Sequence, residues 1–282
     1  MPTDPLRVLV PLDGSTESES ILPALMPLFR RRPVKVTLLQ VVPPDEAGAP
    51  VQEYLAGLRR NLLLDGVQAE SRTEWGNPAD EILYYSRETW CDLVAMTSHG
   101  RTGLRRVLLG SVAESVMRHA QVPVLVNRPW TRVGDWLRLV VPLDGSPRAE
   151  AAIPDALRLA KLQGATVHVL GVSPPPALYG DYAAAAIAAE QADVNYLEKV
   201  CDRFASGGVM ATAAVREGPP GWEISKFAGE VGAGLVCMAT HGRTGVGRAL
   251  VGSVTEDVLR AAPCPVYVRR TVAAAKPARA TA

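Results

Sequence analysis

Two glycine-rich segments of the chain have the residue types and the spacing of an anion-binding loop. The first is Met96-Thr97-Ser98-His99-Gly100-Arg101-Thr102-Gly103, and the second is Met238-Ala239-Thr240-His241-Gly242-Arg243-Thr244-Gly245. In both, nine residues separate the glycine after the histidine from a Gly-Ser pair, Gly110-Ser111 or Gly252-Ser253. Glycine lets a backbone approach a ligand closely, and a helix that begins at Gly-Ser points free N–H groups and a positive dipole end outward. The spacing therefore predicts a phosphate-type site that occurs twice.

An aspartate in a repeated motif precedes each glycine-rich segment in the chain. Val8 to Ser15 matches Leu139 to Ser146, and both contain Pro-Leu-Asp-Gly-Ser with Asp13 or Asp144. A carboxylate suits a ribose hydroxyl, while a glycine loop and a helix start suit phosphates. The combination predicts a nucleotide site in each half of the chain.

Structural explanations compete with this interpretation. Ser111-Val112-Ala113-Glu114 and Ser253-Val254-Thr255-Glu256 have the form of capping boxes, in which the serine would be the N-cap. Ser15 and Ser146 could likewise cap helices after simple strand-to-helix turns. The joint spacing, found twice, favours the nucleotide site.

The histidines and arginines of the repeated segments carry less information. His99 and His241 have no carboxylate at catalytic spacing, so we expect their backbone to matter more than their imidazole. Arg101 and Arg243 fit a phosphate contact or a solvated surface equally well.

The whole chain of 282 residues is an internal repeat. Met96 to Arg118 and Met238 to Arg260 are identical at 14 of 23 positions. The second copy carries 11 additional residues, which we place between Pro174 and Ala186. We expect a first domain over residues 1–129, a linker over 130–136, a second domain over 137–270 and a disordered tail over 271–282.

Strand and helix patterns alternate in each copy. The expected strands are Arg7–Leu12, Val34–Val42, Ala69–Glu74, Leu93–Thr97 and Val122–Arg128, then Leu139–Leu143, Thr166–Val172, Ala211–Arg216, Leu235–Ala239 and Pro265–Arg269. The expected helices of the first copy are Ser15–Arg31, Gln52–Leu64, Pro78–Glu88 and Ser111–Ala120. Apolar strands spaced by helices predict two α/β domains of the doubly wound, Rossmann-like type, each with a five-stranded parallel sheet and helices on both faces. Ligands of such folds bind at the carboxyl ends of the strands, where the strand order reverses.

Composition excludes several classes of partner. The net charge of +1 gives no electrostatic basis for binding nucleic acid or an acidic membrane surface. No apolar run approaches the ~20 residues of a membrane span, and the start of the chain has no signal-peptide pattern. The four cysteines, Cys91, Cys201, Cys237 and Cys264, lack the spacing of a metal site and are expected to be buried reduced thiols. We therefore expect a cytoplasmic protein without a bound structural metal.

At these residues the chain resembles the universal stress protein family in its tandem two-domain form. ATP-binding members carry Gly-x-x-Gly, nine residues, and then Gly followed by Ser or Thr. The last three elements are present in both copies, but Thr97 and Ala239 replace the first glycine. Because alanine adds one methyl group and threonine adds more bulk, we expect the second copy to bind nucleotide at least as well as the first.

The resemblance implies ATP as the ligand, with Mg or Mn optionally held through its phosphates. It implies that the aspartates contact the ribose or the adenine edge, the valines contact adenine, the methionines line the base and sugar, and the glycine and helix-start residues cradle phosphate. The implied binding residues are Pro11, Asp13, Val41, Met96, His99, Gly100, Gly110, Ser111, Val112 and Ala113 in the first copy, and Pro142, Asp144, Val172, Met238, His241, Gly242, Gly252, Ser253, Val254 and Thr255 in the second.

The resemblance also implies a stress-response protein that works through nucleotide-dependent changes of conformation or partner, not through catalysis. Family members dimerise through the last strand, so Val124–Val126 and Val266–Val268 could pair within one chain as a pseudo-dimer, leaving a homodimer optional and the protein partner unknown. The sequence lacks a Ser-Gly-Gly-x-Asp-Ser pyrophosphatase loop and a Walker Gly-Lys-Ser/Thr motif, which disfavours an ATP-consuming enzyme. Three alternatives stay open: slow ATP hydrolysis, a flavin-binding module, and a nucleotide-free scaffold.

Overall fold

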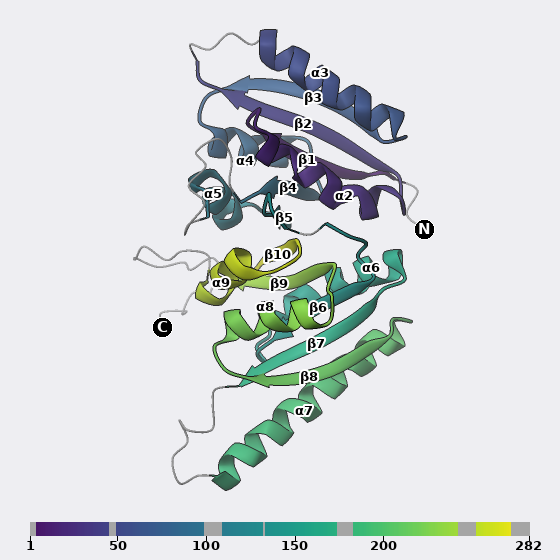
Figure 1. Cartoon of the computed structure of the whole chain (residues 1–282), viewed down its shortest axis with the longest axis vertical. Coiled ribbons are helices and arrows are strands. Elements are labelled where there is room, and N and C mark those ends of the chain that lie inside the picture. The colour runs from purple at the N-terminus through teal and green to yellow at the C-terminus, as the bar shows by residue number, and fades with distance from the viewer. Residues whose placement is uncertain are drawn as a thin grey trace, which may run out of the picture.

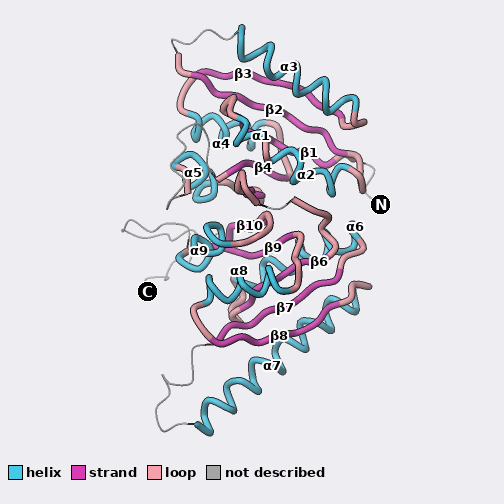
Figure 2. The backbone as a smooth tube through the Cα atoms, viewed as in Figure 1, coloured by secondary structure: helices cyan, strands magenta, loops and turns pink. Residues whose placement is uncertain are grey.

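A ten-stranded sheet runs through the length of the molecule, and helices cover both of its faces (Figures 1 and 2). The computed structural model describes residues 4–44, 49–98, 109–131, 133–173, 183–241 and 252–271, without the side chains of residues 183–192 and 241. The strands are β1 (Leu6–Leu12), β2 (Val34–Val42), β3 (Gln68–Trp75), β4 (Leu93–Thr97), β5 (Val124–Asn127), β6 (Arg138–Leu143), β7 (Thr166–Ser173), β8 (Ala211–Glu217), β9 (Leu235–His241) and β10 (Val266–Thr271). The helices are α1 (Thr16–Glu19), α2 (Ile21–Phe29), α3 (Ala49–Leu64), α4 (Pro78–Glu88), α5 (Ser111–His119), the 3-10 helix η1 (Ala149–Ala152), α6 (Ile153–Gln163), α7 (Ala183–Ser206), α8 (Pro220–Glu230) and α9 (Ser253–Ala261).

The strand order across the sheet is β3-β2-β1-β4-β5-β10-β9-β6-β7-β8. Within each half, all neighbouring strands are parallel. The order reverses beside β1, which lies between β2 and β4, and beside β6, which lies between β7 and β9. The predicted doubly wound α/β fold, with a five-stranded parallel sheet in each half, is confirmed.

The two halves are joined by an antiparallel pair of strands. β5 pairs with β10, with Val126 opposite Val266, Leu125 opposite Tyr267 and Val124 opposite Val268. These side chains are almost completely buried, because the strands lie in the middle of the sheet with helices above and below. The predicted pairing of the two last strands within one chain is therefore confirmed, and the pair makes one sheet out of two.

The inner strands are largely buried on both faces, as their nearly continuous apolar sequences predict, whereas the edge strands β3 and β8 are partly exposed. One buried cluster lies under α2, α3, α6 and α7, and the other lies under α4, α5, α8 and α9. Both clusters contain residues from both halves of the chain, so the hydrophobic core is continuous across the β5–β10 junction. This core holds the carboxyl ends of the strands at fixed positions.

Two segments differ from the sequence-based expectation. The helix predicted over Ser15–Arg31 is two helices, α1 and α2, with a turn at Ser20 between them. Pro23 explains the break, because its nitrogen has no hydrogen to donate to the carbonyl of Glu19. Trp136, which we expected in the linker, is only 1% exposed and belongs to the core. The chain passes so close to the sheet there that a Cβ on Gly234 would collide with the carbonyl oxygen of Asp135.

Trp90 has a strained backbone conformation, which is evident from a comparison with the same position of the second copy. Its φ is +50°, and the glycine at the same position of the second copy, Gly232, has φ +60°. An L-residue pays a steric cost of about 1–2 kcal/mol in this left-handed region, whereas glycine does not. Trp90 is 80% exposed, so its side chain recovers little of this cost by burial.

We predict that Trp90→Gly raises the free energy of unfolding by about 1 kcal/mol, because it removes the left-handed strain at an exposed site. Urea unfolding followed by circular dichroism would measure this. The matched control, Gly232→Ala, introduces the same strain in the second copy and should lower stability by a similar amount. A Trp90→Gly protein that is less stable than the parent would contradict the strain argument.

Candidate functional site

Each half contains a cavity at the carboxyl ends of its strands, beside the point where the strand order reverses. The cavity of the first half lies between β1, β2 and β4 and the start of α5, with a volume of about 240 Å³. The cavity of the second half lies between β6, β7 and β9 and the start of α9, with a volume of about 890 Å³. This is the position at which open parallel sheets bind ligands.

The cavities gather most of the residues that the sequence singled out. Eight of the ten predicted residues line each cavity: Pro11, Asp13, Val41, Met96, Gly110, Ser111, Val112 and Ala113 in the first half, and Pro142, Asp144, Val172, Met238, Gly252, Ser253, Val254 and Thr255 in the second. His99, Gly100 and Gly242 lie outside the described residues, as do Arg101 and Arg243, and the backbone of His241 ends β9. Segments far apart in the sequence therefore meet at one place, while the role of these residues in binding stays a prediction.

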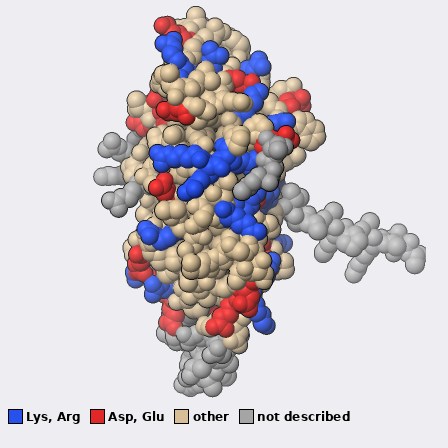
Figure 3. Space-filling view, turned by 90° about the vertical axis from the view of Figure 1, so that its right-hand side faces the viewer, with Lys and Arg blue, Asp and Glu red and all other residues tan. Residues whose placement is uncertain are grey.

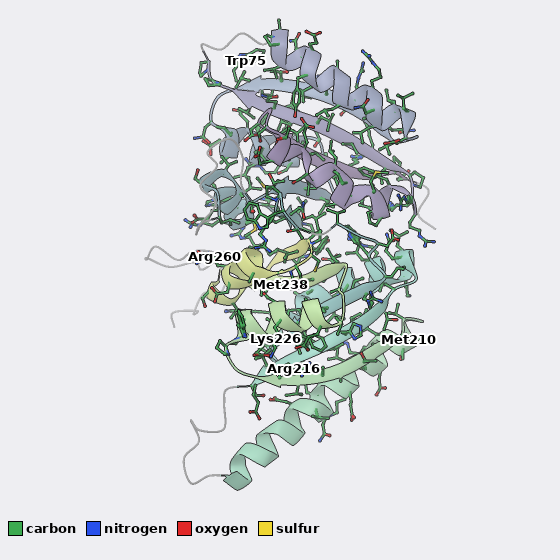
Figure 4. All side chains as sticks on the ribbon, viewed as in Figure 1. Trp75, Met210, Arg216, Lys226, Met238 and Arg260 are labelled. Carbon is green, nitrogen blue, oxygen red and sulfur yellow. The ribbon has the colours of Figure 1, made fainter. Side chains whose placement is uncertain are left out.

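One side of each cavity is apolar. In the second half Leu170 and Val172 from β7, Met238 from β9 and Ile224 from α8 form this wall. Figure 4 shows Met238 in the interior of this half, and its side chain is buried. The first half repeats the wall with Leu39, Val41, Met96 and Ile82. Apolar walls of this kind suit an aromatic ring.

The aspartate loops are held by their own backbone. Asp13 Oδ1 accepts hydrogen bonds from the backbone N–H of Ser15 at 3.0 Å and from its hydroxyl at 2.5 Å. Asp144 Oδ1 accepts the N–H of Ser146 at 3.0 Å. The intervening glycines have φ of +81° and +74°, which explains why both copies use Asp-Gly-Ser. The hydroxyl of Ser15 accepts the N–H of Ser18 as the N-cap of α1, so the capping prediction for this serine is confirmed. The hydroxyl of Ser146 accepts the N–H of Ala149, but Ser146 caps no helix, because the N-cap of η1 is Arg148.

The helix starts differ from the capping-box interpretation, which is wrong in both copies. The N-caps are Gly110 and Gly252, and neither helix has a side-chain cap. Ser111 and Ser253 are the first helical residues, and the glutamates Glu114 and Glu256 turn away to form ion pairs one helical turn later, with Arg118 and Arg260. The first-turn N–H groups of α5 and α9 are thus without side-chain acceptors among the described residues, next to a cavity. Such groups are the ones that bind anions.

The start of α5 is fixed by the neighbouring strand. The N–H of Gly110 donates to the carbonyl of Ser98 at 2.8 Å, and the N–H of Ser98 donates to the carbonyl of Asn127 at 2.9 Å. Because β4 and β5 are part of the sheet, this chain of hydrogen bonds ties the helix start to the core.

Two tyrosines near the aspartate loops belong to the site, although no sequence motif pointed to them. Tyr54 on α3 and Tyr196 on α7 occupy equivalent positions of the repeat. Burial raises the pKa of Tyr196, and its hydrogen bond to Glu150 at 3.0 Å and the nearby charge of Asp144 raise that pKa further. Burial likewise raises the pKa of Tyr54, followed by the charge of Glu19 and, more weakly, that of Asp13. The shared position of the two tyrosines was a signal that the repeat alone could have given.

A network around Glu150 stabilises the second loop. Arg203 Nη1 lies 2.7 Å from Glu150 Oε2, and this contact, opposed by partial burial and supported by Tyr196, lowers the pKa of the glutamate. Glu150 belongs to η1, which directly follows the Asp144 loop. The network therefore positions one edge of the larger cavity.

The opposite side of the molecule, at the amino ends of the strands, has a different surface. Figure 3 shows this face, where basic and acidic side chains are interspersed and Lys and Arg gather near its middle. Trp75 at the carboxyl end of β3 and Met210 just before β8 mark the two sides in Figure 4. The cavities lie on the side of Trp75.

Metal binding and membrane insertion find little support among the residues that the structure describes. They contain no group of three or more His, Cys, Asp and Glu side chains that could hold a metal ion. Each helix within those ranges is too short or too polar to cross a lipid bilayer. The four cysteines are free, and only Cys201 is not buried.

Burial also determines the reactivity of the thiols. It raises the pKa of Cys91 and of Cys264 to about 12, and it raises the pKa of Cys237 well above its usual value. The half-exposed Cys201 has a pKa that burial raises as well. Because the thiolate is the reactive form, the three buried thiols should be protected in the folded protein, and the more exposed Cys201 should react first.

We predict that Ellman's reagent at pH 8 labels about one thiol per folded chain, Cys201, and all four after addition of guanidinium chloride. Cys201→Ser should abolish labelling of the folded protein. Rapid labelling of Cys237 or Cys264, located by peptide mass, would contradict the burial on which the prediction rests.

Comparisons with known proteins agree with this architecture. Residues 6–128 and 136–270 each match the sequence model of the universal stress protein family. A universal stress protein of Mycobacterium tuberculosis is 29% identical over 290 aligned residues, which cover 93% of this chain and 96% of that protein. One of Methanocaldococcus jannaschii is 35% identical over 136 residues, covering 46% of this chain and 80% of its own length.

A solved structure extends over nearly the whole chain. The crystal structure of a universal stress protein from Archaeoglobus fulgidus superimposes with a TM-score of 0.74 at 22% identity, covering 94% of this chain and 98% of that one. At that identity the likeness establishes the fold.

Proposed function

Since this chain belongs to the universal stress protein family, with two family domains in tandem, we propose that it is an ATP-binding stress-response protein. It binds adenine nucleotide in the cavities at the carboxyl ends of the strands. It acts through nucleotide-dependent changes of conformation or protein partner, and it has no dedicated catalytic machinery.

The observation that carries the proposal is the start of α9. Gly252 begins the helix without a side-chain cap, and the first-turn residues Ser253, Val254 and Thr255 line a cavity whose other rim holds Asp144. Helix N–H groups and dipole bind phosphate, a carboxylate binds a ribose hydroxyl, and the apolar wall accepts adenine. All three parts of a nucleotide have a matching surface within one cavity.

The size of the second cavity supports the same proposal. Its volume of about 890 Å³ lies within the range of about 300–1,000 Å³ that is typical of small-molecule sites. The first cavity, at about 240 Å³, is smaller than that range. Its lining includes the β-branched Thr97, where the second cavity has Ala239. This difference supports stronger binding in the second half.

The described side chains of the second cavity favour binding over catalysis. Asp144 is engaged by the N–H of Ser146, and Glu256 is engaged by Arg260. A general base needs a carboxylate or imidazole within reach of the proton that it removes. The mechanism is therefore one of recognition, in which ATP bridges the aspartate loop and the helix start. Buried reduced thiols fit the cytoplasm as the place of action.

The rival function is a nucleotide-free scaffold, which the missing first glycine suggests. The second half argues against it, because Ala239 adds one methyl group and the cavity beside it stays open. Helix N–H groups that have no side-chain acceptor among the described residues, in a cavity that also contains an aspartate, are also not needed for a scaffold.

We predict that freshly purified protein releases adenine nucleotide on denaturation, and that the emptied protein binds ATP in calorimetric titration. Gly252→Val should weaken ATP binding in the second half by tenfold or more, because two methyl groups would occupy the phosphate position. The φ of −42° and ψ of 142° at Gly252 lie close to the β region that valine adopts, and the comparison requires that the variant keeps its fold. Circular dichroism and the melting temperature check this.

Gly110→Val is the matched control in the first half, where φ is −57° and ψ is 143°. It should leave most of the ATP binding intact if the second half is the stronger site. Absence of both released nucleotide and binding heat in the parent protein would favour the scaffold. Unchanged ATP affinity in a folded Gly252→Val protein would place the phosphates elsewhere.

A further inference from the structure

Trp90 has a side chain that contributes little to the fold and a backbone that opposes it. The side chain is 80% exposed, and Trp90 is the one non-glycine residue with a positive φ among those that the structure describes. Gly232, at the same position of the second copy, makes an equivalent turn without strain. A bulky residue in this region is a backbone outlier, and such outliers cluster at functional sites. Trp90 therefore draws attention to the surface around it.

The two copies use an equivalent arginine differently at this turn. In the second copy Arg138 Nε donates to the carbonyl of Gly232 at 3.1 Å, and a Cβ on this glycine would lie 3.0 Å from Arg138 Nη2. In the first copy Arg7 Nη1 donates to the carbonyl of Thr89 at 3.4 Å, one residue before Trp90. The second half thus has an arginine packed against a glycine, whereas the first half presents an exposed indole beside its arginine.

Further arginines lie next to the Trp90 turn. Asp92, two residues after Trp90, lines a small cavity together with Arg32 from the first half and Arg158 from the second. Asp92 Oδ2 also accepts the backbone N–H of Arg7 at 2.9 Å. With a volume of about 20 Å³, the cavity has room for little more than a water molecule, so a larger partner would contact the side chains around it. Trp90, Arg7, Arg32 and Arg158 are called the Trp90 surface below.

The charges of Arg7 and Arg32 are not neutralised by ion pairs. Arg7 donates to the carbonyl of Thr89, and Arg32 Nη2 donates to the carbonyl of Asp4 at 3.0 Å. None of the ion pairs between described residues includes either arginine. A carbonyl accepts the hydrogen bond without cancelling the charge, so both arginines give this surface a positive potential.

Arg158 adds to this potential because it shares its carboxylate. Arg158 Nη2 lies 3.1 Å from Asp155 Oδ1, but Arg269 binds the same carboxylate with two hydrogen bonds, of 2.5 Å and 2.8 Å. One carboxylate therefore faces two guanidinium groups, and the side chain of Arg158 is 53% exposed. Its helix, α6, lies with α2 on the right of Figure 1, the side on which Figure 3 shows Lys and Arg gathered near the middle.

The residue types of the Trp90 surface indicate the kind of partner. Tryptophan and arginine are enriched among the residues that contribute most to protein–protein binding, and the guanidinium fork matches a carboxylate. A second copy of this chain, bound through the same surface, would bring arginines against arginines. A nucleic-acid backbone would carry its phosphates past Asp92, which repels them. A protein segment with separate carboxylates meets neither obstacle.

We propose that the Trp90 surface binds an acidic segment of a partner protein. The arginines bind carboxylates of the segment, and the indole of Trp90 packs against an apolar side chain between them. The surface lies at the amino ends of the strands, away from both cavities, so this binding is independent of the proposed nucleotide binding.

The test is fluorescence anisotropy of a fluorescein-labelled peptide of alternating glutamate and leucine, titrated with the full-length chain. The parent protein should bind this peptide, and added salt should weaken the binding because the contacts are between charges. The same peptide with lysine in place of glutamate should not bind.

Trp90→Gly, which copies the second half, should weaken binding of the glutamate peptide about tenfold. The same change should raise the melting temperature, because it removes the backbone strain, so the loss of binding cannot come from unfolding. Trp222→Ala is the matched control, since Trp222 is 63% exposed at the start of α8, and it should leave the affinity unchanged.

Arg32→Glu should weaken binding of the glutamate peptide at least as much, because it replaces attraction with repulsion. Lys226→Glu makes the same charge change on α8, which covers the other face of the sheet and is labelled in Figures 1 and 4. This control should have a much smaller effect.

Four outcomes would overturn the proposal. They are no binding of the glutamate peptide by the parent protein, equal binding of the lysine peptide, unchanged affinity in Trp90→Gly, and equal losses in Arg32→Glu and Lys226→Glu. Labelled duplex DNA that bound more tightly than the glutamate peptide would assign the surface to nucleic acid and would overturn it as well.

Discussion

The candidate sites depend on a feature of the sheet: β1 and β4 are neighbours, and so are β6 and β9, although other strands intervene in the sequence. The loops that leave two such neighbours turn to opposite faces of the sheet, which opens a crevice between them. The aspartate loop enters from one strand, and the glycine-begun helix enters beside the other. The aspartate loop directly follows a buried strand, and in the first half the N–H of Gly110 donates to the carbonyl of Ser98 beside β4, so the core sets the separation of the two elements there.

The β5–β10 pair extends this constraint across the molecule. Arg128, directly after β5 in the first half, donates hydrogen bonds to the carbonyls of Arg260 and Ala262 at the end of α9 in the second half. These carbonyls are the negative end of the helix whose positive end faces the larger cavity. Burial lowers the pKa of Arg128, but the guanidinium stays charged and stabilises that end of the helix. The first half thus contributes to the electrostatics of the second site.

Much of the architecture could be predicted because it depends on local patterns. Apolar runs predicted the strands Val34–Val42, which lies between two prolines, and Leu93–Thr97, and both ranges are confirmed. Because the chain is a repeat, the strands and motifs predicted in one half could be compared with those in the other. The motifs lie at the ends of strands, and this position was enough to predict that residues far apart in the sequence meet. The expected pairing of the last strands was also correct.

The errors come from interactions that a linear pattern does not contain. The Ser-x-x-Glu pattern predicted serine caps, but Arg118 and Arg260, one turn further on, hold the glutamates instead. Trp136 lies in a segment whose sequence resembles a linker. It is nevertheless buried, because the chain passes directly over Gly234. The unequal sizes of the two cavities depend on three-dimensional packing, and only the exchange of Thr97 for Ala239 gave a sign of it.

Hydrogen–deuterium exchange of the emptied protein, with and without saturating ATP, tests the central claim most directly. If α9 binds phosphate through the N–H groups of its first turn, ATP should slow exchange at the amides of Ser253, Val254 and Thr255 and in the Asp144 loop. The outer strands β3 and β8 should exchange at the same rate in both states. Bound ATP that leaves the start of α9 unprotected, or that protects only the far side of the sheet, would contradict the account.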